Sequence, residues 1–292
     1  RADVILALGT RLNQSSTFWD YRVLTPQTRI VQVDIDAQEI GRNYPVAVGM
    51  VGDAKAVAQQ LLQALRQTAP QGHPKPQWRA EVEALAARRQ ARLQEELALT
   101  GEPMMPQRVY PELRKVLPPD CMVTIDAGVA PGLAYDRLHF DVPRTMFNYA
   151  GHGGLGMGLC VGLGTKLGRP DRPAISLQGD GGFLYTSQEL NTAVRWGIPL
   201  VSIVLNNGCH GAEKAQQQRF YNERYIGVDL VNPRFDKLAE VYGARGFYVQ
   251  HADEIADVVK EALALHGPSV IEIPVAEYFP RAAPTPASAG RH

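Results

Sequence analysis

Short apolar runs that alternate with segments of helix length are the feature that most restricts the fold of this chain. The runs are bounded by turn-forming residues and occupy positions 4–8, 30–33, 122–125, 174–177, 200–205 and 270–273. Strands buried on both faces are apolar along their whole length, and parallel strands need crossover segments between them, so the pattern indicates helix-covered parallel sheets. We therefore expect an α/β fold of doubly wound, mostly parallel sheets flanked by helices.

The composition excludes several classes of protein. The 292 residues include 30 Lys and Arg against 30 Asp and Glu, and 45% are hydrophobic, which is typical of about two folded domains and not of a disordered chain. Without net charge there is no basic field for nucleic acid or an anionic membrane, so we expect neither partner. No apolar stretch approaches the roughly 20 residues of a bilayer span. Three cysteines without metal-ligand spacing favour a reducing, cytoplasmic setting.

The sequence divides into four parts. Residues 1–67 form a first block, closed by a helix over 53–65 with Asp53 as its N-cap and an apolar stripe along one face. Residues 68–105 contain a linker and a charged surface helix over 78–99, and residues 106–280 form the second block. Residues 281–292 lack an apolar period, and we expect them to be a flexible tail.

Polar residues follow two successive strands of the second block. Gly179-Asp180-Gly181-Gly182 comes after the run at 174–177, and Asn206-Asn207 comes after the run at 200–205. Ligands of doubly wound sheets bind outside the carboxyl ends of the strands, so Asp180 and Asn207 are expected to converge there. Hard oxygen ligands suit Mg²⁺, which commonly also binds phosphate oxygens. Each half of this motif alone is also typical of an ordinary turn, but together they predict a diphosphate held through a metal.

A glycine-rich stretch is the second candidate for ligand contact. Residues 151–158 (GHGGLGMG) open a helix, and backbone N–H groups there can face an anion or a ring, although small residues also permit tight helix packing. Asp126 and Gly128 follow the run at 122–125 and can contact the diphosphate, with a capping turn as the alternative for Asp126.

Residues after Asn207 are candidates for substrate contact. Histidine is a residue type that can move a proton or donate to an oxyanion, so His210 is a candidate for this role, as is His152 of the glycine-rich stretch. Lys214 can pair an anionic substrate group. For each of these residues the alternative is an ordinary structural role: local hydrogen bonding for the histidines and a solvated helix turn for Lys214.

These segments resemble the thiamine diphosphate (ThDP) enzyme superfamily, specifically its acetolactate synthase-like branch. The resemblance covers nearly the whole chain: residues 106–280 are similar to the ThDP diphosphate-binding domain. Residues 1–67, with the strings VQVDID, EIGRN and VGDAKAV, are similar to the C-terminal part of the central Rossmann-like domain. The implied cofactors are ThDP and Mg²⁺.

The resemblance also assigns roles to individual residues. It implies that Asp180, Asn207 and the main-chain carbonyl of Cys209 ligate Mg²⁺, and that Leu155 supports the bent form of ThDP unless it is simply a core residue. The remaining cofactor-binding residues that it implies are Asp126, Gly128, Gly153, Gly154, Gly179, Gly181, Gly182 and Tyr185.

The implied activity is cleavage or formation of C–C bonds, by decarboxylation of a 2-keto acid or by acyl transfer. Ala212 and Gln216 stand where acetolactate synthase has Met and Trp, and the string GAEK is instead similar to sulfoacetaldehyde acetyltransferase. Ala212 and Lys214 are therefore expected to contact substrate together with His210. A 2-hydroxyacyl-CoA lyase or an oxalyl-CoA decarboxylase-like lyase is the alternative. Two other classes are a non-catalytic relative and a nicotinamide-dependent dehydrogenase, although no full G-x-G-x-x-G motif opens a first βαβ unit here as a dehydrogenase would require.

The first block and the start of the chain suggest further partners. Gly9 and either Asp34 or Asp36 stand where a dinucleotide fold places its turn and its ribose-binding acid, so FAD, ADP or no nucleotide remain open there. Since Arg1 directly precedes a strand, we expect a C-terminal part of a longer polypeptide, whose N-terminal pyrimidine-binding region supplies the catalytic Glu across a subunit interface. A homodimer or homotetramer acting on a small keto acid or acyl substrate is the expected assembly.

Overall fold

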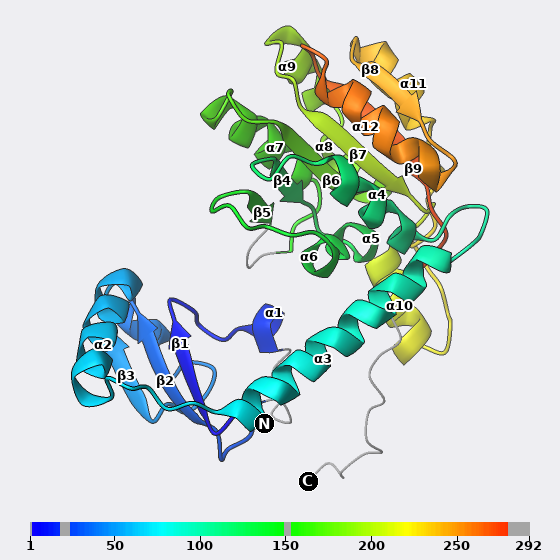
Figure 1. The fold of residues 1–292 in the computed structure, drawn as a ribbon. Coiled ribbons are helices and arrows are strands. Elements are labelled where there is room, and N and C mark those ends of the chain that lie inside the picture. Colours follow the sequence, from blue (N-terminus) through cyan, green and yellow to red (C-terminus); the bar gives the residue numbers. More distant parts are fainter. Residues whose placement is uncertain (1, 18–23, 149–152, 280–292) are drawn as a thin grey trace. The chain divides into compact units, whose positions relative to one another are not determined.

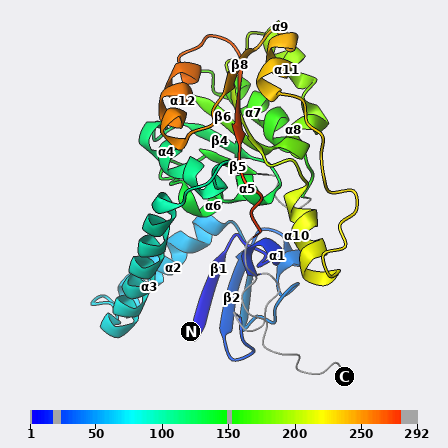
Figure 2. The same cartoon turned by 90° about the vertical axis from the view of Figure 1, so that its right-hand side faces the viewer.

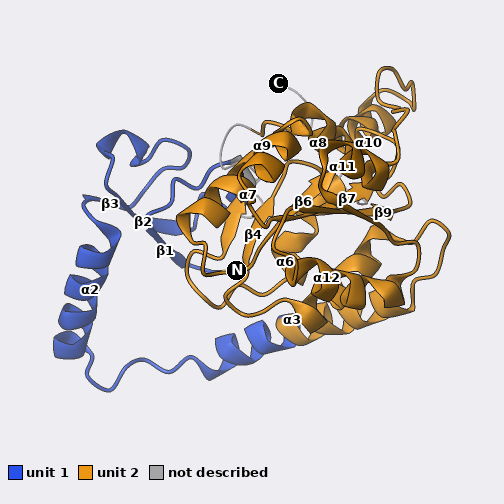
Figure 3. Ribbon diagram, turned by 90° about the horizontal axis from the view of Figure 1, so that it is seen from above, with its two compact units in different colours: residues 1–85 blue, residues 86–292 orange. Residues whose placement is uncertain are grey.

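The structure, a computed structural model, describes residues 2–17, 24–148 and 153–279. It consists of two compact units, residues 1–85 and 86–292, which Figure 3 distinguishes by colour. The division falls inside the long helix α3 (Pro76–Glu95), within residues 68–105 that are predicted to hold the linker and the surface helix. Among the residues described, no helix combines the length and the apolar character needed to cross a bilayer.

The first unit contains a three-stranded parallel sheet in the order β1-β2-β3. Its elements are β1 (Val4–Leu8), α1 (Gln14–Thr17), β2 (Arg29–Asp34), the 3-10 turn η1 (Ala37–Glu39), β3 (Val48–Val51) and α2 (Ala54–Thr68). Asp53 Oδ1 accepts a hydrogen bond from the Ala56 N–H at 2.9 Å, which confirms the predicted N-cap of α2. None of the α2 residues is buried, so its apolar stripe is only partly covered within this unit.

The charged segment between the blocks is helical, as predicted, but it ends earlier than residue 99. Helix α3 (Pro76–Glu95) continues into a short 3-10 turn, η2 (Glu96–Ala98). No residue of α3 is buried, in keeping with its high content of Arg, Glu and Gln.

The second unit is built on a six-stranded parallel sheet in the order β5-β4-β6-β7-β9-β8 (Figure 1). Its strands are β4 (Met122–Ile125), β5 (Met146–Asn148), β6 (Ala174–Gly179), β7 (Val201–Asn206), β8 (Arg245–Tyr248) and β9 (Ser269–Pro274). The α/β prediction is therefore confirmed. The predicted runs fall on the four buried central strands, whereas the edge strands β5 and β8 and the short β3 lack a continuous apolar run and escaped prediction.

Helices cover both faces of this sheet (Figure 2). The residues buried on the two faces differ in polarity. The helices of the second unit are α4 (Val109–Val116), α5 (Val129–Gly132), α6 (Ala134–Arg137), α7 (Met157–Gly168), α8 (Asp180–Thr186), α9 (Glu189–Arg195), α10 (Gly211–Phe220), α11 (Phe235–Tyr242) and α12 (Ile255–Leu263). One face packs apolar residues against α4 and α12. The face toward α7 and α11 also buries polar residues, among them Ser176, Ser202 and Glu272.

Candidate functional site

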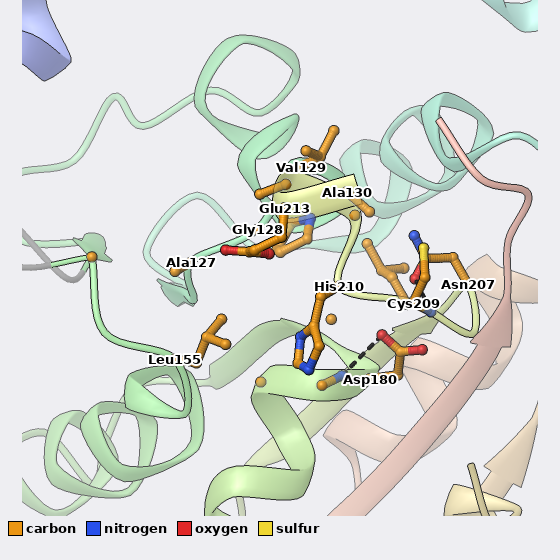
Figure 4. A pocket seen from close by; sticks show the side chains of 18 residues that line it. Ala127, Gly128, Val129, Ala130, Leu155, Asp180, Asn207, Cys209, His210 and Glu213 are labelled. Carbon is orange, nitrogen blue, oxygen red and sulfur yellow. Dashed lines mark hydrogen bonds between the residues drawn. The ribbon is translucent and has the colours of Figure 1, made fainter. Parts of the chain in front are cut away.

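A pocket of about 220 Å³ lies at the carboxyl ends of β4, β6 and β7 and collects most of the predicted site residues (Figure 4). Predicted residues that line it are Gly128, Gly153, Leu155, Gly179, Asp180, Gly181, Gly182, Asn207, Cys209, His210 and Ala212. Because β4, β6 and β7 run parallel, the loops that follow them meet at this one edge of the sheet although they are distant in sequence. Typical ligand sites measure roughly 300–1,000 Å³, so the described residues enclose only part of a cofactor-sized ligand.

Asp180 is one of two acidic residues that line the pocket, the other being Glu213, and it is almost completely buried. Its Oδ1 accepts the Gly181 N–H at 2.9 Å, and its Oδ2 accepts the Gly208 N–H at 2.8 Å and Asn232 Nδ2 at 2.7 Å. Burial raises the pKa of Asp180 above its ordinary value, and the hydrogen bonds from Gly181, Asn232 and Gly208 act in the opposite direction. The carboxylate is thus fixed by its neighbours while it still lines the pocket.

Asn207 and Cys209 lie beside Asp180 on the loop that follows β7, as Figure 4 shows. Asn207 Oδ1 accepts the Cys209 N–H at 3.2 Å, which folds this loop into a tight turn. Burial raises the pKa of the Cys209 thiol to about 12. Mg²⁺ prefers oxygen ligands to soft sulfur ligands, so the main-chain carbonyl is the atom of Cys209 that would suit this cation.

This donor set fits a metal that is shared with a phosphate ligand. No group of three His, Cys, Asp or Glu side chains in the described part of the chain can hold a metal alone. A carboxylate, a side-chain amide and a main-chain carbonyl are nevertheless oxygen donors of the type that Mg²⁺ accepts. A cation held by these three donors would have one charged protein ligand and would take its remaining ligands from elsewhere, as Mg²⁺ does from phosphate oxygens.

Two glycines that follow Asp180 leave no room for a side chain, each because of a different neighbour. A Cβ at Gly181 would lie 2.5 Å from His210 Cε1, and a Cβ at Gly182 would lie 2.5 Å from Asp126 Oδ2. Both glycines line the pocket, but their lack of a side chain already follows from these neighbours. Figure 4 shows the His210 ring between Leu155 and Asp180, inside the pocket.

Asp126 follows β4 but turns away from the pocket. It is fully buried, its Oδ1 accepts the Ala127 N–H at 2.8 Å, and its Oδ2 accepts the Gly156 N–H at 3.0 Å, at the start of α7. Burial raises the pKa of Asp126, and hydrogen bonds from Ala127 and from the start of α7 oppose that rise. Its neighbours Ala127 and Gly128 line the pocket in its place.

Four other predicted residues do not line the pocket or cannot be placed. Tyr185 on α8 is 62% exposed, and Gly154 is also exposed, outside the pocket wall. Lys214 Nζ lies 2.8 Å from Asp229 Oδ1 and 2.6 Å from Glu277 Oε1, so two carboxylates already balance its charge. His152 lies outside the described residues.

Sequence reasoning missed two residues with polar side chains at this site. Glu213, in the first turn of α10, lines the pocket, and its spacing of three residues from His210 is a signal that could have found it. Asn232 contacts Asp180 from 52 residues away, and no local pattern announces such a contact.

Family models identify the class of protein that this fold and site define. Residues 126–273 match the thiamine pyrophosphate enzyme, C-terminal TPP binding domain, and residues 1–61 match the thiamine pyrophosphate enzyme, central domain. The chain therefore belongs to the thiamine pyrophosphate enzyme family, which confirms the resemblance drawn from the motifs and supports ThDP as the cofactor.

Individual relatives narrow the comparison. The chain is 31% identical over 287 residues to a sulfoacetaldehyde acetyltransferase of Alcaligenes xylosoxydans xylosoxydans, covering 90% of this chain and 47% of that protein. It is 32% identical over 282 residues to an acetolactate synthase of Mycobacterium avium, covering 93% of this chain and 44% of that protein. A probable acetolactate synthase large subunit of Methanocaldococcus jannaschii is 32% identical over 291 residues, with 97% and 48% covered. The chain spans about half the length of these relatives.

Proposed function

We propose that the intact protein is a ThDP- and Mg²⁺-dependent enzyme that cleaves or forms C–C bonds by transferring an acyl group. The observation that carries this proposal is the convergence of Asp180, Asn207 and Cys209 on one pocket with the glycine-rich stretch. Membership of the family supports the cofactor, and the names of the relatives support acyl transfer from a small keto acid or related donor.

Residues of this chain would bind the metal, orient the cofactor and exchange a proton. Asp180, Asn207 and the Cys209 carbonyl would hold Mg²⁺ and thereby orient the diphosphate of ThDP. When bound, ThDP supplies a carbanion that adds to a carbonyl and accepts the electrons released when a C–C bond breaks. His210 lines the pocket, where its imidazole would be placed to exchange a proton with a bound substrate.

The substrate side of the proposal rests on Ala212 and Glu213 more than on Lys214. Ala212 and Glu213 line the pocket, whereas the Lys214 ammonium is engaged by Asp229 and Glu277. Direct pairing of Lys214 with an anionic substrate would require breaking both ion pairs. We therefore propose that Lys214 anchors the start of α10 instead of binding substrate.

The partial enclosure of the pocket supports an additional contributor to the active site. We propose that a pyrimidine-binding region, provided with a second copy of the chain in a homo-oligomer, covers the open side and supplies the catalytic Glu. Three unpaired cysteines support a cytoplasmic location.

Calorimetric titration of ThDP into the intact protein, with and without Mg²⁺, tests the proposal. Wild-type protein should bind ThDP in a Mg²⁺-dependent manner. Asp180→Ala should weaken this binding by more than about 100-fold, beyond the roughly 10–100-fold that residues supporting a metal ligand contribute. Asp171→Ala removes an exposed carboxylate of the same unit and serves as the matched control, with affinity unchanged. Equal affinities of the wild type with and without Mg²⁺ would contradict the metal assignment.

A further inference from the structure

We propose that Asn232 is a positioning residue that fixes the Asp180 carboxylate for metal binding, at the end of a buried polar chain that begins at Glu272. The inference deepens the proposed function and rests on it, because it takes Asp180 as a metal ligand. Neither the motifs nor the family matches assign a role to Asn232.

Asn232 contacts Asp180 directly. Asn232 Nδ2 donates to Asp180 Oδ2 at 2.7 Å and to Asn206 Oδ1 at 2.9 Å. Two acceptors surround this nitrogen, so the hydrogen bonds themselves determine which end of the amide faces Asp180. The side chain thus presents a donor to the carboxylate in a fixed direction.

The two carboxylate oxygens of Asp180 differ in the number of hydrogen bonds that they accept. Oδ2 accepts two hydrogen bonds, from Gly208 and Asn232, whereas Oδ1 accepts one, from Gly181. An ionised carboxylate offers about four acceptor sites, two on each oxygen. The donors therefore saturate Oδ2 and leave capacity on Oδ1 for a cation.

Asn206 and Glu272 hold Asn232 in place from the side away from Asp180. Asn206 Nδ2 donates to Glu272 Oε1 at 2.8 Å, and Glu272 Oε2 accepts the Phe235 N–H at 2.7 Å. Glu272 is only 2% exposed, so its position is set by β9 and by the first residue of α11. The chain Glu272–Asn206–Asn232–Asp180 consequently connects the rigid centre of the sheet to the pocket.

The unused acceptor of Asn232 indicates that the donor is what this position requires. Asn232 Oδ1 is buried and has no hydrogen-bond partner among the described residues. Burying an amide oxygen unpaired costs free energy. An apolar residue at this position would avoid that cost, but it could not donate hydrogen bonds to Asp180 and Asn206.

The experiment compares Asn232→Ala with wild type and with Thr145→Val in the intact protein. Thr145→Val removes another buried hydrogen bond of the same unit, from Thr145 Oγ1 to the Val142 carbonyl, away from the pocket. ThDP binding is measured by calorimetry across a series of Mg²⁺ concentrations, and the spectrum of Mn²⁺ bound with ThDP is recorded by electron paramagnetic resonance.

Asn232→Ala should raise the Mg²⁺ concentration needed for half-maximal ThDP binding by about 10–100-fold, with ThDP affinity restored at saturating Mg²⁺. The Mn²⁺ spectrum should change in Asn232→Ala and not in Thr145→Val. Asn206→Ala, which removes the acceptor that orients Asn232, should shift the Mg²⁺ requirement in the same direction and supplies a second variant if Asn232→Ala does not fold.

The outcomes separate this inference from the proposed function. Metal-independent binding in the wild type would overturn both. Normal Mg²⁺ dependence in the wild type, with the same half-maximal concentration in folded Asn232→Ala, would overturn only the role of Asn232. An equal shift in Thr145→Val would also overturn it, since general destabilisation would then account for the effect.

Discussion

Two aspartates at the carboxyl ends of neighbouring strands have opposite orientations in this protein. Asp126 follows β4, Asp180 follows β6, and the two strands pair in parallel with Ile125 beside Leu177. Both side chains are buried, with exposed fractions of 0% and 1%, and burial raises the pKa of both. By sequence pattern and environment they are nearly equivalent.

Their hydrogen-bond partners make the difference. Asp126 accepts the N–H of Gly156 at the start of α7 and does not line the pocket. Asp180 is the first residue of α8 and lines the pocket. It accepts the N–H of Gly181 in α8 and the N–H of Gly208 in the loop after β7. A buried acid at a strand end therefore either accepts the N–H groups at the start of a helix or faces a pocket, according to which element lies opposite.

The largest expected effect that tests this comparison is the loss of Asp126. Asp126→Ala leaves the N–H groups of Ala127 and Gly156 buried without an acceptor, so we expect the free energy of unfolding to fall by about 3 kcal/mol. Denaturant titration measures this loss. At a temperature where the variant stays folded, its Mg²⁺-dependent ThDP affinity should match the wild type. A loss of metal dependence like that expected for Asp180→Ala would show that both aspartates serve the ligand.

An intermediate loss of stability is expected from a substitution at Gly182, which lies close to Asp126. Gly182 belongs to α8, but its Cβ position lies 2.5 Å from Asp126 Oδ2. Gly182→Ala should therefore displace the Asp126 carboxylate and lower the free energy of unfolding by about 2 kcal/mol. Gly164→Ala is the control, because a Cβ there meets nothing within 4 Å and Ala is the better helix former by roughly 0.5–1 kcal/mol. Equal stability of the two variants would contradict the close approach.

The smallest expected effect is a difference in pH dependence. The pKa of Asp126 is raised in the folded protein, so folding favours its protonated form. Its contribution to stability is therefore largest below the pKa of the unfolded chain, near 4, and is lost as the pH rises through the folded pKa. Each unit by which the folded pKa exceeds the unfolded one corresponds to about 1.4 kcal/mol.

Urea unfolding of metal-free wild type and Asp126→Asn between pH 4 and 7 isolates this contribution. The stability of the wild type relative to Asp126→Asn should decline as the pH rises, because only the wild type loses a bound proton at position 126. A constant difference across the range would indicate that Asp126 titrates alike in the folded and unfolded chains.

Much of the second unit was accessible from the sequence because its central strands are buried on both faces. The runs at 122–125, 174–177, 200–205 and 270–273 fall on β4, β6, β7 and β9. Edge strands are half-exposed, so β5 and β8 lack that continuous apolar signal. In the first unit, the short β3 was missed because Gly49 interrupts its apolar run.

The sequence by itself determined the α/β class, the family, and the placement of Asp180 and Asn207 at strand ends, because each depends on residues that are close together along the chain. Only the tertiary structure decided that Asp126 faces α7, that Lys214 pairs with Asp229 and Glu277, and that Asn232 holds Asp180. The contacts of Asp126 and Asn232 join residues 30 and 52 positions apart. The packing of helices on the sheet sets such contacts, and local patterns do not encode it.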